Sequence, residues 1–202
     1  MIKLKYIGII GRINDDKITY NREIINIIYS YNCIPICISL NFIDDYEKEF
    51  LTIKPLLDKC EGFILQGGNE IYNIDLLIVK YLHKKDIPTL GICLGMQTMG
   101  MAFNGILGNI DKHYNNDKYV HNIIIDEKSK LFEIIRKKEI MVNSRHHDYL
   151  STTALSKSSF NNVLESIEDP NKKFFIGVQW HPESIMDNNS NLLFNSFFSS
   201  IN

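Results

Sequence analysis

The chain has 202 residues, of which 45% are hydrophobic and 23% are charged, and its formal net charge is −2. A chain of this length and composition can bury a full hydrophobic core, so we expect a single domain over residues 1–202. The near balance of 22 basic and 24 acidic side chains gives no electrostatic footprint for nucleic acid or for an anionic membrane surface. No apolar run approaches the length of a membrane span, so the sequence predicts neither kind of partner.

The cysteines and the start of the chain bear on the cellular compartment. Cys33, Cys37, Cys60 and Cys93 lack the spacing of a metal site. Residues 1–5 lead into strand-like sequence and not into the apolar core of a signal peptide. We therefore expect free thiols in a cytoplasmic protein.

The first half of the chain alternates strand and helix patterns. Short apolar runs bounded by turn residues predict strands, and apolar residues at helical spacing predict helices. The strands are expected at residues 6–11, 34–40, 62–65 and 89–92, and the helices at 21–31, within 44–58, at 74–85 and at 96–103. This alternation is typical of a parallel sheet with helices on both faces and right-handed crossovers.

The last of these strands runs into a cysteine flanked by small residues. Gly91, Cys93 and Gly95 have the spacing that lets a strand turn sharply into a helix around one nucleophile. Such an elbow places the sulfur at a helix N-terminus, which favours the thiolate, and directs the N–H of Leu94 to the position of an oxyanion. By itself the pentapeptide fits equally well a buried cysteine that packs a strand against a helix.

The second half predicts further strands joined by polar turns. They are expected at residues 121–125, 139–142, 163–167 and 174–179, with a hairpin-type turn at 169–172 and a short helix at 129–135. Asn189 or Ser190 is expected to cap a closing helix. No internal repeat or linker is visible.

The best candidate for a catalytic base follows the strand at 174–179. Glu183 stands two positions after His181, so at strand spacing the two side chains point to the same side. A carboxylate there can accept the imidazole Nδ1–H, fix the tautomer and raise the basicity of the ring toward a thiol. The alternative is a surface turn with a chance His and Glu, but nucleophile, base and orienting carboxylate together match the logic of a catalytic triad.

A glycine pair, Gly67 and Gly68, follows the strand at 62–65. Glycines past a strand end allow close backbone approach to a ligand, so an N–H there can complete an oxyanion hole begun by Leu94. An ordinary tight turn is the alternative. The oxyanion interpretation depends on this strand lying beside the strand that carries the cysteine.

Two motifs resemble a known family. Residues 91–97 (GICLGMQ) and 177–183 (GVQWHPE) look like those of the class I, triad-type glutamine amidotransferases. Residues 142–147 and the region from His113 to Ile123 resemble the stand-alone γ-glutamyl hydrolase branch, which includes the γ-glutamyl-γ-aminobutyrate hydrolases. The resemblance spans essentially the whole chain.

The resemblance implies a flavodoxin-like, three-layer α/β/α domain with a mostly parallel central sheet and an antiparallel extension. It implies Cys93 as nucleophile, His181 as base and Glu183 as the orienting carboxylate. The N–H groups of Gly68 and Leu94 are the implied oxyanion donors. The residues expected near the glutamyl amino and carboxylate groups are Gly67, Gln97, Asn143, Ser144, Arg145 and His146.

The expected reaction is hydrolysis of a small γ-glutamyl amide through a thioester on the cysteine, with no cofactor and no metal. The sequence does not identify the amine. One alternative is a glutaminase subunit that supplies ammonia to a separate synthetase. Another is a DJ-1-like cysteine sensor, which would need no distant oriented base. The adjacent His146 and His147 diverge too much for easy joint ligation of a metal ion, and we expect His113 and His121 to pack or hydrogen-bond at the edge of the site.

Overall fold

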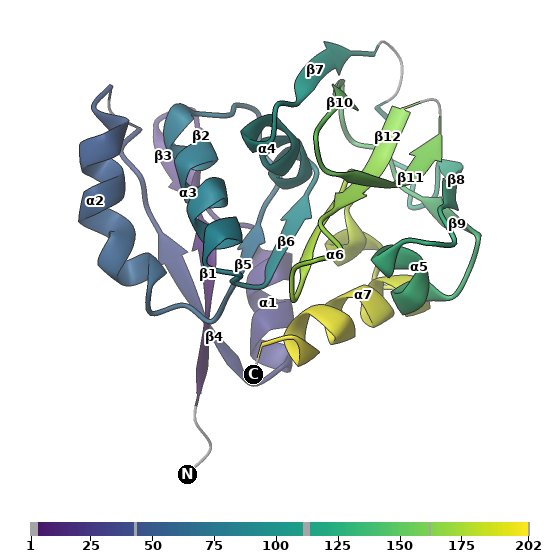
Figure 1. The fold of residues 1–202 in the computed structure, drawn as a ribbon, viewed down its shortest axis with the longest axis horizontal. Coiled ribbons are helices and arrows are strands. Elements are labelled where there is room, and N and C mark those ends of the chain that lie inside the picture. Colours follow the sequence, from purple (N-terminus) through teal and green to yellow (C-terminus); the bar gives the residue numbers. More distant parts are fainter. Residues whose placement is uncertain (1–3, 43, 111–113, 162, 202) are drawn as a thin grey trace.

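The computed structural model describes residues 4–42, 44–110, 114–161 and 163–201. Within these ranges, a nine-stranded sheet forms the centre of the molecule, in the order β4-β1-β5-β6-β13-β12-β11-β8-β9 (Figure 1). Helices lie on both faces of the sheet, so that the architecture has three layers. The predicted α/β/α fold with a mostly parallel sheet and an antiparallel extension is confirmed.

The parallel part of the sheet comes from the first half of the chain together with one late strand. Its strands are β1 (Lys5–Ile10), β4 (Cys33–Ile38), β5 (Gly62–Leu65), β6 (Thr89–Ile92) and β13 (Phe175–Val178). Every pairing among them is parallel. Pro35 lies in β4, the edge strand, where a residue without an N–H leaves no central ladder bond unmade.

The antiparallel part carries the chain away from β13. Its strands are β12 (Val163–Glu168), β11 (Ser156–Asn161), β8 (His121–Ile125) and β9 (Glu139–Val142). β11 was not predicted, because its sequence SKSSFN lacks the apolar alternation of a strand. It is a strand because β8 and β12 pair with it from both sides.

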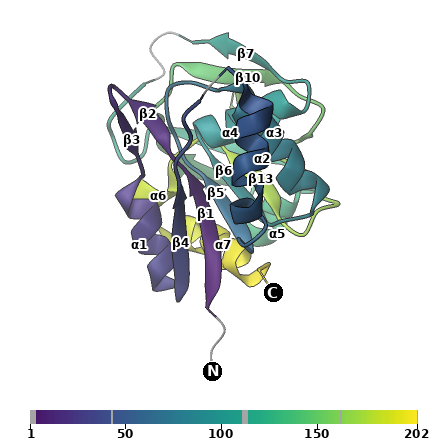
Figure 2. The ribbon, with the colours of Figure 1, turned by 90° about the vertical axis from the view of Figure 1, so that its left-hand side faces the viewer.

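Two small sheets and one short helix were also not predicted. The sheets are β2 (Arg12–Asn14) with β3 (Lys17–Thr19), and β7 (Ile106–Asn109) with β10 (Asp148–Thr152). Figures 1 and 2 both show the β7–β10 pair at the top of the molecule, beyond α4. The short helix, α6 (Pro182–Ile185), follows β13. Segments such as RIN, KIT and PESI lack the apolar run between turn residues that marks the predicted strands.

Two hydrophobic clusters fill the space between the sheet and its helices. The helices are α1 (Arg22–Ser30), α2 (Tyr46–Leu57), α3 (Asn73–Lys84), α4 (Leu94–Ala102), α5 (Lys130–Ile135) and α7 (Asn188–Ser199). Ile28 of α1 and Phe197 of α7 belong to one cluster, and Leu57 of α2 and Ile78 of α3 belong to the other. Figure 2 shows α1 on one side of β4 and β1, and α2 with α3 on the other.

The helix caps follow the sequence in one case and depart from it in another. Asn21 caps α1 as predicted, since its side chain accepts from the N–H groups of Glu23 and Ile24. The cap of α7 is Asp187, whose Oδ1 accepts from the Ser190 N–H at 2.8 Å. The predicted cap at Asn189 or Ser190 is therefore wrong, because the helix begins before both residues.

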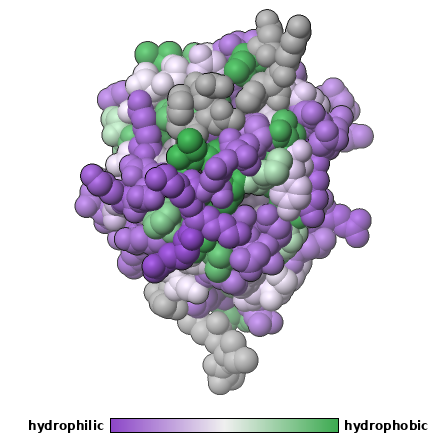
Figure 3. All heavy atoms as spheres, turned by 90° about the vertical axis from the view of Figure 1, so that its right-hand side faces the viewer, coloured by the Kyte–Doolittle hydropathy of each residue, from purple (hydrophilic) through white to green (hydrophobic). Residues whose placement is uncertain are grey.

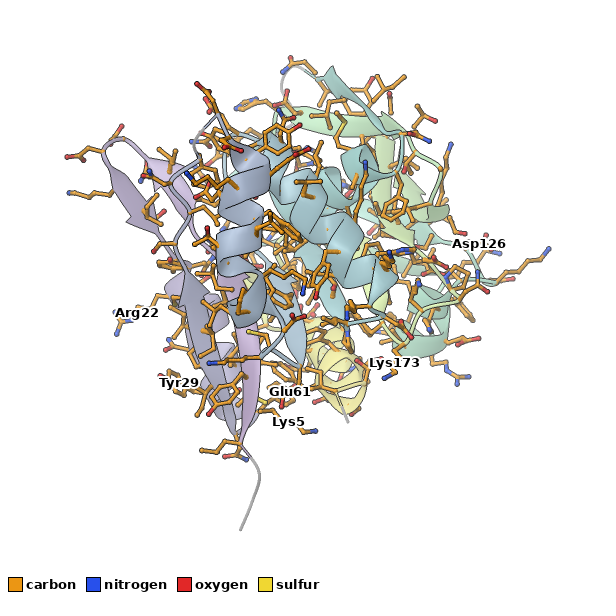
Figure 4. All side chains as sticks on the ribbon, turned by 60° about the vertical axis from the view of Figure 1, so that its left-hand side comes forward. Lys5, Arg22, Tyr29, Glu61, Asp126 and Lys173 are labelled. Atoms are coloured by element: carbon orange, nitrogen blue, oxygen red, sulfur yellow. The ribbon has the colours of Figure 1, made fainter. Side chains whose placement is uncertain are left out.

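The surface is mainly polar. Figure 3 shows hydrophobic atoms in small groups among hydrophilic ones on the face that includes β8 and β9. Figure 4 shows charged side chains such as Lys5, Glu61 and Lys173 pointing outward from the lower part of the molecule. Among the described residues, no helix is long and apolar enough to cross a membrane.

Candidate active site

The predicted elbow joins β6 to α4. Cys93 stands between them with φ 53° and ψ −107°, a conformation that is rare for residues other than glycine and that occurs at strained functional positions. Its N–H donates to the Val178 carbonyl of β13 at 2.8 Å. This bond ties the elbow to the strand that leads to His181.

Glycines on both sides of the cysteine allow the chain to double back. A Cβ on Gly95 would lie 2.1 Å from the carbonyl oxygen of Leu65 in β5, and a Cβ on Gly91 would lie 2.8 Å from the backbone nitrogen of Met96. Both distances are shorter than any allowed contact with backbone. The small residues at these two positions are therefore a steric requirement of the elbow.

His181 and Glu183 meet, but not at strand spacing. β13 ends at Val178, and His181 caps α6, so Glu183 lies in the first turn of a short helix. Pro182 occupies the first helical position, where its missing N–H costs nothing. His181 Nδ1 donates to Glu183 Oε1 over 2.7 Å. The predicted contact is present, while the predicted strand geometry is wrong.

The imidazole of His181 lies between a carboxylate and the thiol. Burial by itself lowers the pKa of His181, but hydrogen bonds to Cys93 and Glu183 and the negative charges of both groups outweigh it, and the pKa rises to about 10. Because Nδ1 donates to the carboxylate, Nε2 is the nitrogen that can exchange a proton with the sulfur. The arrangement favours the imidazolium form of His181.

Two asparagines bind His181 and Glu183. Asn143, at the end of β9, accepts from the His181 N–H at 2.8 Å and donates to the His181 carbonyl at 3.1 Å. Asn21 donates from Nδ2 to Glu183 Oε1 at 3.3 Å while its Oδ1 caps α1. Sequence reasoning recognised the cap at Asn21 but not its bond to Glu183, since only the fold brings the start of α1 to α6.

The two candidate oxyanion donors lie on neighbouring strand ends. β5 and β6 pair in parallel, so the loop after β5 lies beside the elbow, as the oxyanion interpretation requires. A Cβ on Gly68 would lie 3.0 Å from the side chain of Leu94, and a Cβ on Gly67 would lie 3.0 Å from His181 Cε1. Leu94 is the first residue of α4, so its N–H has no partner within the helix.

A pocket of about 310 Å³ opens at the cysteine. Its lining residues are Gly68, Asn69, Cys93, Leu94, Gln97, Tyr114, Arg145, His146, His147 and Asp148. Three of the predicted substrate-binding residues, Gln97, Arg145 and His146, are therefore on its wall. Arg145 has a buried Nε that makes no hydrogen bond within the described part of the chain.

The other predicted substrate-binding residues lie elsewhere. Asn143 and Ser144 are buried and are not part of the pocket wall. Asn143 holds the main chain of His181, and the Ser144 carbonyl accepts from the Asn115 N–H at 2.8 Å. Gly67 is not part of that wall either and packs against the imidazole of His181.

The remaining histidines differ in their surroundings. His121 Nε2 lies 3.1 Å from Glu165 Oε1, a buried carboxylate of β12, so it hydrogen-bonds as expected. His147 is exposed and stacks on Tyr114. His113 lies outside the described residues. Within the described ranges, no three His, Cys, Asp or Glu side chains are grouped so as to hold a metal ion.

One contact at the cysteine was missed by the sequence. Gln179 is fully buried, and its Nε2 lies 3.6 Å from the sulfur of Cys93. The signal was a polar residue in the apolar strand two positions before His181. Only the tertiary structure places Gln179 against Cys93, because β13, which ends just before Gln179, pairs with β6.

Comparison with known proteins points to one family. Residues 13–200 match the family model described as glutamine amidotransferase class-I. A glutamine amidotransferase-like protein of Rickettsia prowazekii (strain Madrid E) is 26% identical over 215 residues, which cover 70% of this chain and 76% of that protein. The glutamine-hydrolyzing GMP synthase of Francisella tularensis subsp. novicida (strain U112) is 30% identical over 148 residues, which cover 71% of this chain and 28% of the synthase.

Solved structures share the fold. A Thermoplasma acidophilum protein described as a GMP synthase subunit has a TM-score of 0.75 at 16% identity, covering 100% of this chain and 96% of that one. The glutaminase domain of Trypanosoma brucei CTPS, solved with bound acivicin, has a TM-score of 0.70 at 16% identity, covering 98% and 95%. The family match extends over most of the sequence, and this chain belongs to the class-I glutamine amidotransferases.

Proposed function

We propose that this protein hydrolyses the amide bond of a small γ-glutamyl compound through a glutamyl thioester on Cys93. The observation that carries the proposal is the hydrogen bonding of His181, which contacts the Cys93 sulfur on one side and Glu183 Oε1 on the other. A nucleophile, a base and an orienting carboxylate in this order are the requirements of acyl transfer.

In the first half of the reaction, the Cys93 thiolate attacks the γ-carbonyl carbon and forms a C–S bond. The carbonyl oxygen becomes an oxyanion, and the N–H groups of Leu94 and Gly68 are the proposed donors to it. His181 then gives its proton to the leaving amine as the C–N bond breaks. In the second half, His181 takes a proton from water and the hydroxide attacks the thioester carbonyl. The C–S bond then breaks, which releases glutamate and restores the Cys93 thiolate.

The pocket supports a glutamyl group as the acyl part of the substrate. A glutamyl group carries an α-ammonium and an α-carboxylate, and the wall carries Arg145 and Asp148, which are opposite in charge. The buried Arg145 Nε without a partner among the described residues is destabilising unless a ligand completes it. A carboxylate of the substrate would do so.

A second candidate keeps the chemistry and changes the recipient of the amine. The chain would be a glutaminase subunit that releases ammonia to a separate synthetase. The similarity in fold and length to the Thermoplasma protein favours it, as does the identity with part of the Francisella GMP synthase. The stand-alone γ-glutamyl hydrolase remains our first proposal, with residues 1–202 as a single domain. We also propose the cytoplasm as its compartment, because the four free thiols would persist under reducing conditions.

Glutamate release by the purified chain tests both candidates. The substrates are glutamine and a panel of γ-glutamyl amides with neutral, cationic and anionic amines. Fast release from one of the larger amides would support the stand-alone hydrolase and identify its amine. Slow release from glutamine alone, accelerated by a candidate synthetase, would support the glutaminase subunit.

Cys93→Ala is the decisive variant, because it removes the proposed nucleophile and should abolish turnover of every substrate. Cys37→Ala is the matched control, since Cys37 is an exposed thiol on β4 and should be dispensable. Glutamate release that persists in Cys93→Ala would overturn the thioester mechanism. Absence of release from every amide, with and without a synthetase, would overturn both candidates.

A further inference from the structure

The sulfur of Cys93 has a second neighbour besides His181. Gln179 directs its side-chain N–H groups at the sulfur, with Nε2 and Sγ 3.6 Å apart. The amide of Gln179 is fully buried. A buried N–H beside a sulfur interacts more strongly with the thiolate than with the thiol, because hydrogen bonds to an ionised acceptor are the stronger ones.

The side-chain amide of Gln97 fixes the orientation of the Gln179 amide. Gln97 Nε2 donates to the main-chain carbonyl of Asp148 at 2.8 Å and to Gln179 Oε1 at 3.2 Å. The amide nitrogen and oxygen of glutamine are similar in shape, so hydrogen-bond partners must decide which atom is which. The Asp148 carbonyl can only accept, which requires the nitrogen of Gln97 to face it. Because that nitrogen also donates to Gln179, its acceptor there must be the side-chain oxygen of Gln179. The side-chain nitrogen of Gln179 therefore faces the sulfur.

The Asp148 carbonyl is itself held in place. His146 Nδ1 lies 2.9 Å from the same oxygen and donates to it, since a carbonyl has no proton to give. This series of hydrogen bonds therefore starts at the Asp148 carbonyl on the pocket wall and ends at the sulfur of Cys93. Gln97 lies on that wall. Its side-chain nitrogen donates to the Asp148 carbonyl and to Gln179, whereas its side-chain oxygen makes neither contact.

We propose that Gln179 is a catalytic residue that stabilises the Cys93 thiolate by an N–H···S hydrogen bond, and that Gln97 is a positioning residue that acts through Gln179. The two amides link the wall of the substrate pocket to the sulfur. The inference rests on the proposed function, since it assigns its role to the same nucleophile. It adds a neutral donor to the sulfur besides the imidazole of His181.

The alkylation rate of Cys93 as a function of pH tests the proposal without a substrate. Iodoacetamide reacts with the thiolate, and mass spectrometry of the peptide that contains Cys93 separates its reaction from that of other thiols. In Gln179→Met, which keeps the size and removes the donor, we expect the pH profile of Cys93 alkylation to move to higher pH, with a rate about tenfold lower at neutral pH. The glutamate-release assay should show a lower kcat at a similar KM.

Other charged groups near Cys93 are the same in each variant. They are His181, Glu183 behind it, and Arg145, His146, His147 and Asp148 on the pocket wall. Burial raises the pKa of Cys33, of Cys37 and, to about 12, of Cys60, so these thiols react at higher pH.

Further variants separate the donor from the packing. Gln179→Glu keeps the acceptor for Gln97 and places a carboxylate at the sulfur, so the upward shift should be larger. Gln97→Met should shift the profile in the same direction by less, and the double variant Gln97→Met/Gln179→Met should shift it no further than Gln179→Met alone. Thr98→Val is the matched control on α4, because it removes a buried hydrogen bond to Leu94 that does not involve Cys93.

An unchanged alkylation profile in folded Gln179→Met or Gln179→Glu would overturn the proposal. An equal shift in Thr98→Val would overturn it too, since it would trace the effect to general loosening of α4. Failure of the unmodified protein to release glutamate would count against the proposed function alone. The alkylation result on Gln179 would stand in that case.

Discussion

The charge on His181 is decided by its two neighbours. Burial opposes the imidazolium ion, and the carboxylate of Glu183 and the sulfur of Cys93 favour it strongly enough to raise the pKa to about 10. The ring is therefore protonated at neutral pH and can supply the proton that the leaving amine needs. In the proposed mechanism, loss of that proton at high pH would set the alkaline limit of activity.

Glu183→Gln should slow turnover and move the alkaline limb of its pH profile to lower pH. The carboxylate raises the pKa of His181, so its removal lowers that pKa and the imidazolium ion is lost earlier as the pH rises. We expect turnover to fall roughly 10²- to 10⁴-fold, the usual share of acid–base catalysis. Glutamate release measured across pH checks this, with exposed Glu23→Gln as control. An alkaline limb that does not move in Glu183→Gln would contradict the assignment.

Asn143→Ala tests whether the main chain of His181 must be held. Asn143 makes hydrogen bonds to both the N–H and the carbonyl of His181 and is not part of the pocket wall. Misplacement of the imidazole can cost about 10²-fold in rate, so we expect kcat to fall by about that factor while KM stays nearly constant. Steady-state kinetics separate the two constants. Asn122→Ala, at an exposed position of β8, should leave both unchanged, and a rise in KM alone for Asn143→Ala would favour substrate binding instead.

At the scale of elements, the elbow depends on how closely β5, β6 and α4 approach. Gly95 lets α4 approach the carbonyl of Leu65 closely, and Gly177 of β13 lies against the Cα of Met96. The first contact is with rigid backbone at a distance no Cβ tolerates, and the second allows a small adjustment. The two positions therefore predict different costs for the same added methyl group.

Gly95→Ala should destabilise the fold far more than Gly177→Ala. The added Cβ would lie 2.1 Å from a backbone oxygen at Gly95 and 3.0 Å from its nearest neighbour at Gly177. Overpacking of this kind costs about 3 kcal/mol for the first and about 1 kcal/mol for the second in free energy of unfolding. Urea denaturation measures both values, and equal losses would show that the elbow can open to accept a side chain.

At the scale of the molecule, one sheet connects the parts of the proposed site. Cys93 and the Gly67–Gly68 loop follow parallel strands of the first half, while β13 brings His181 back between β6 and β12. Asn143 reaches the same point from β9 at the far edge. The site therefore needs both halves of the chain folded together.

Unfolding should be a single cooperative transition. The sheet runs through both halves, so neither half has a complete core of its own. Trp180 is the only tryptophan of the chain and is buried beside β13, which makes its fluorescence a local probe of the junction. Far-UV circular dichroism reports the whole molecule. The two urea transitions should superimpose, and separate midpoints would show that the halves unfold independently.

Much of the secondary structure and the reactive side chains could be predicted from the sequence. β5, β6, β8 and β9 lie where apolar runs between turn residues predict them, and Asn21 caps α1 because capping is a local hydrogen bond. The elbow at Cys93 could also be predicted, because its two glycines meet a steric requirement that arises within a few residues. Structure that depends on hydrogen bonds and contacts between near neighbours is visible in short stretches of sequence.

How these groups meet depends on contacts that form only in the folded protein. His181 and Glu183 are joined by a turn of α6, because Pro182 starts a helix where strand spacing was expected. Asn143 binds the His181 main chain and not the pocket, and Gln179 reaches the sulfur through the pairing of β13 with β6. β11 is a strand in spite of polar sequence because its two neighbours supply its hydrogen bonds. Contacts between residues distant in the chain depend on strand order and register, which no short stretch of sequence encodes.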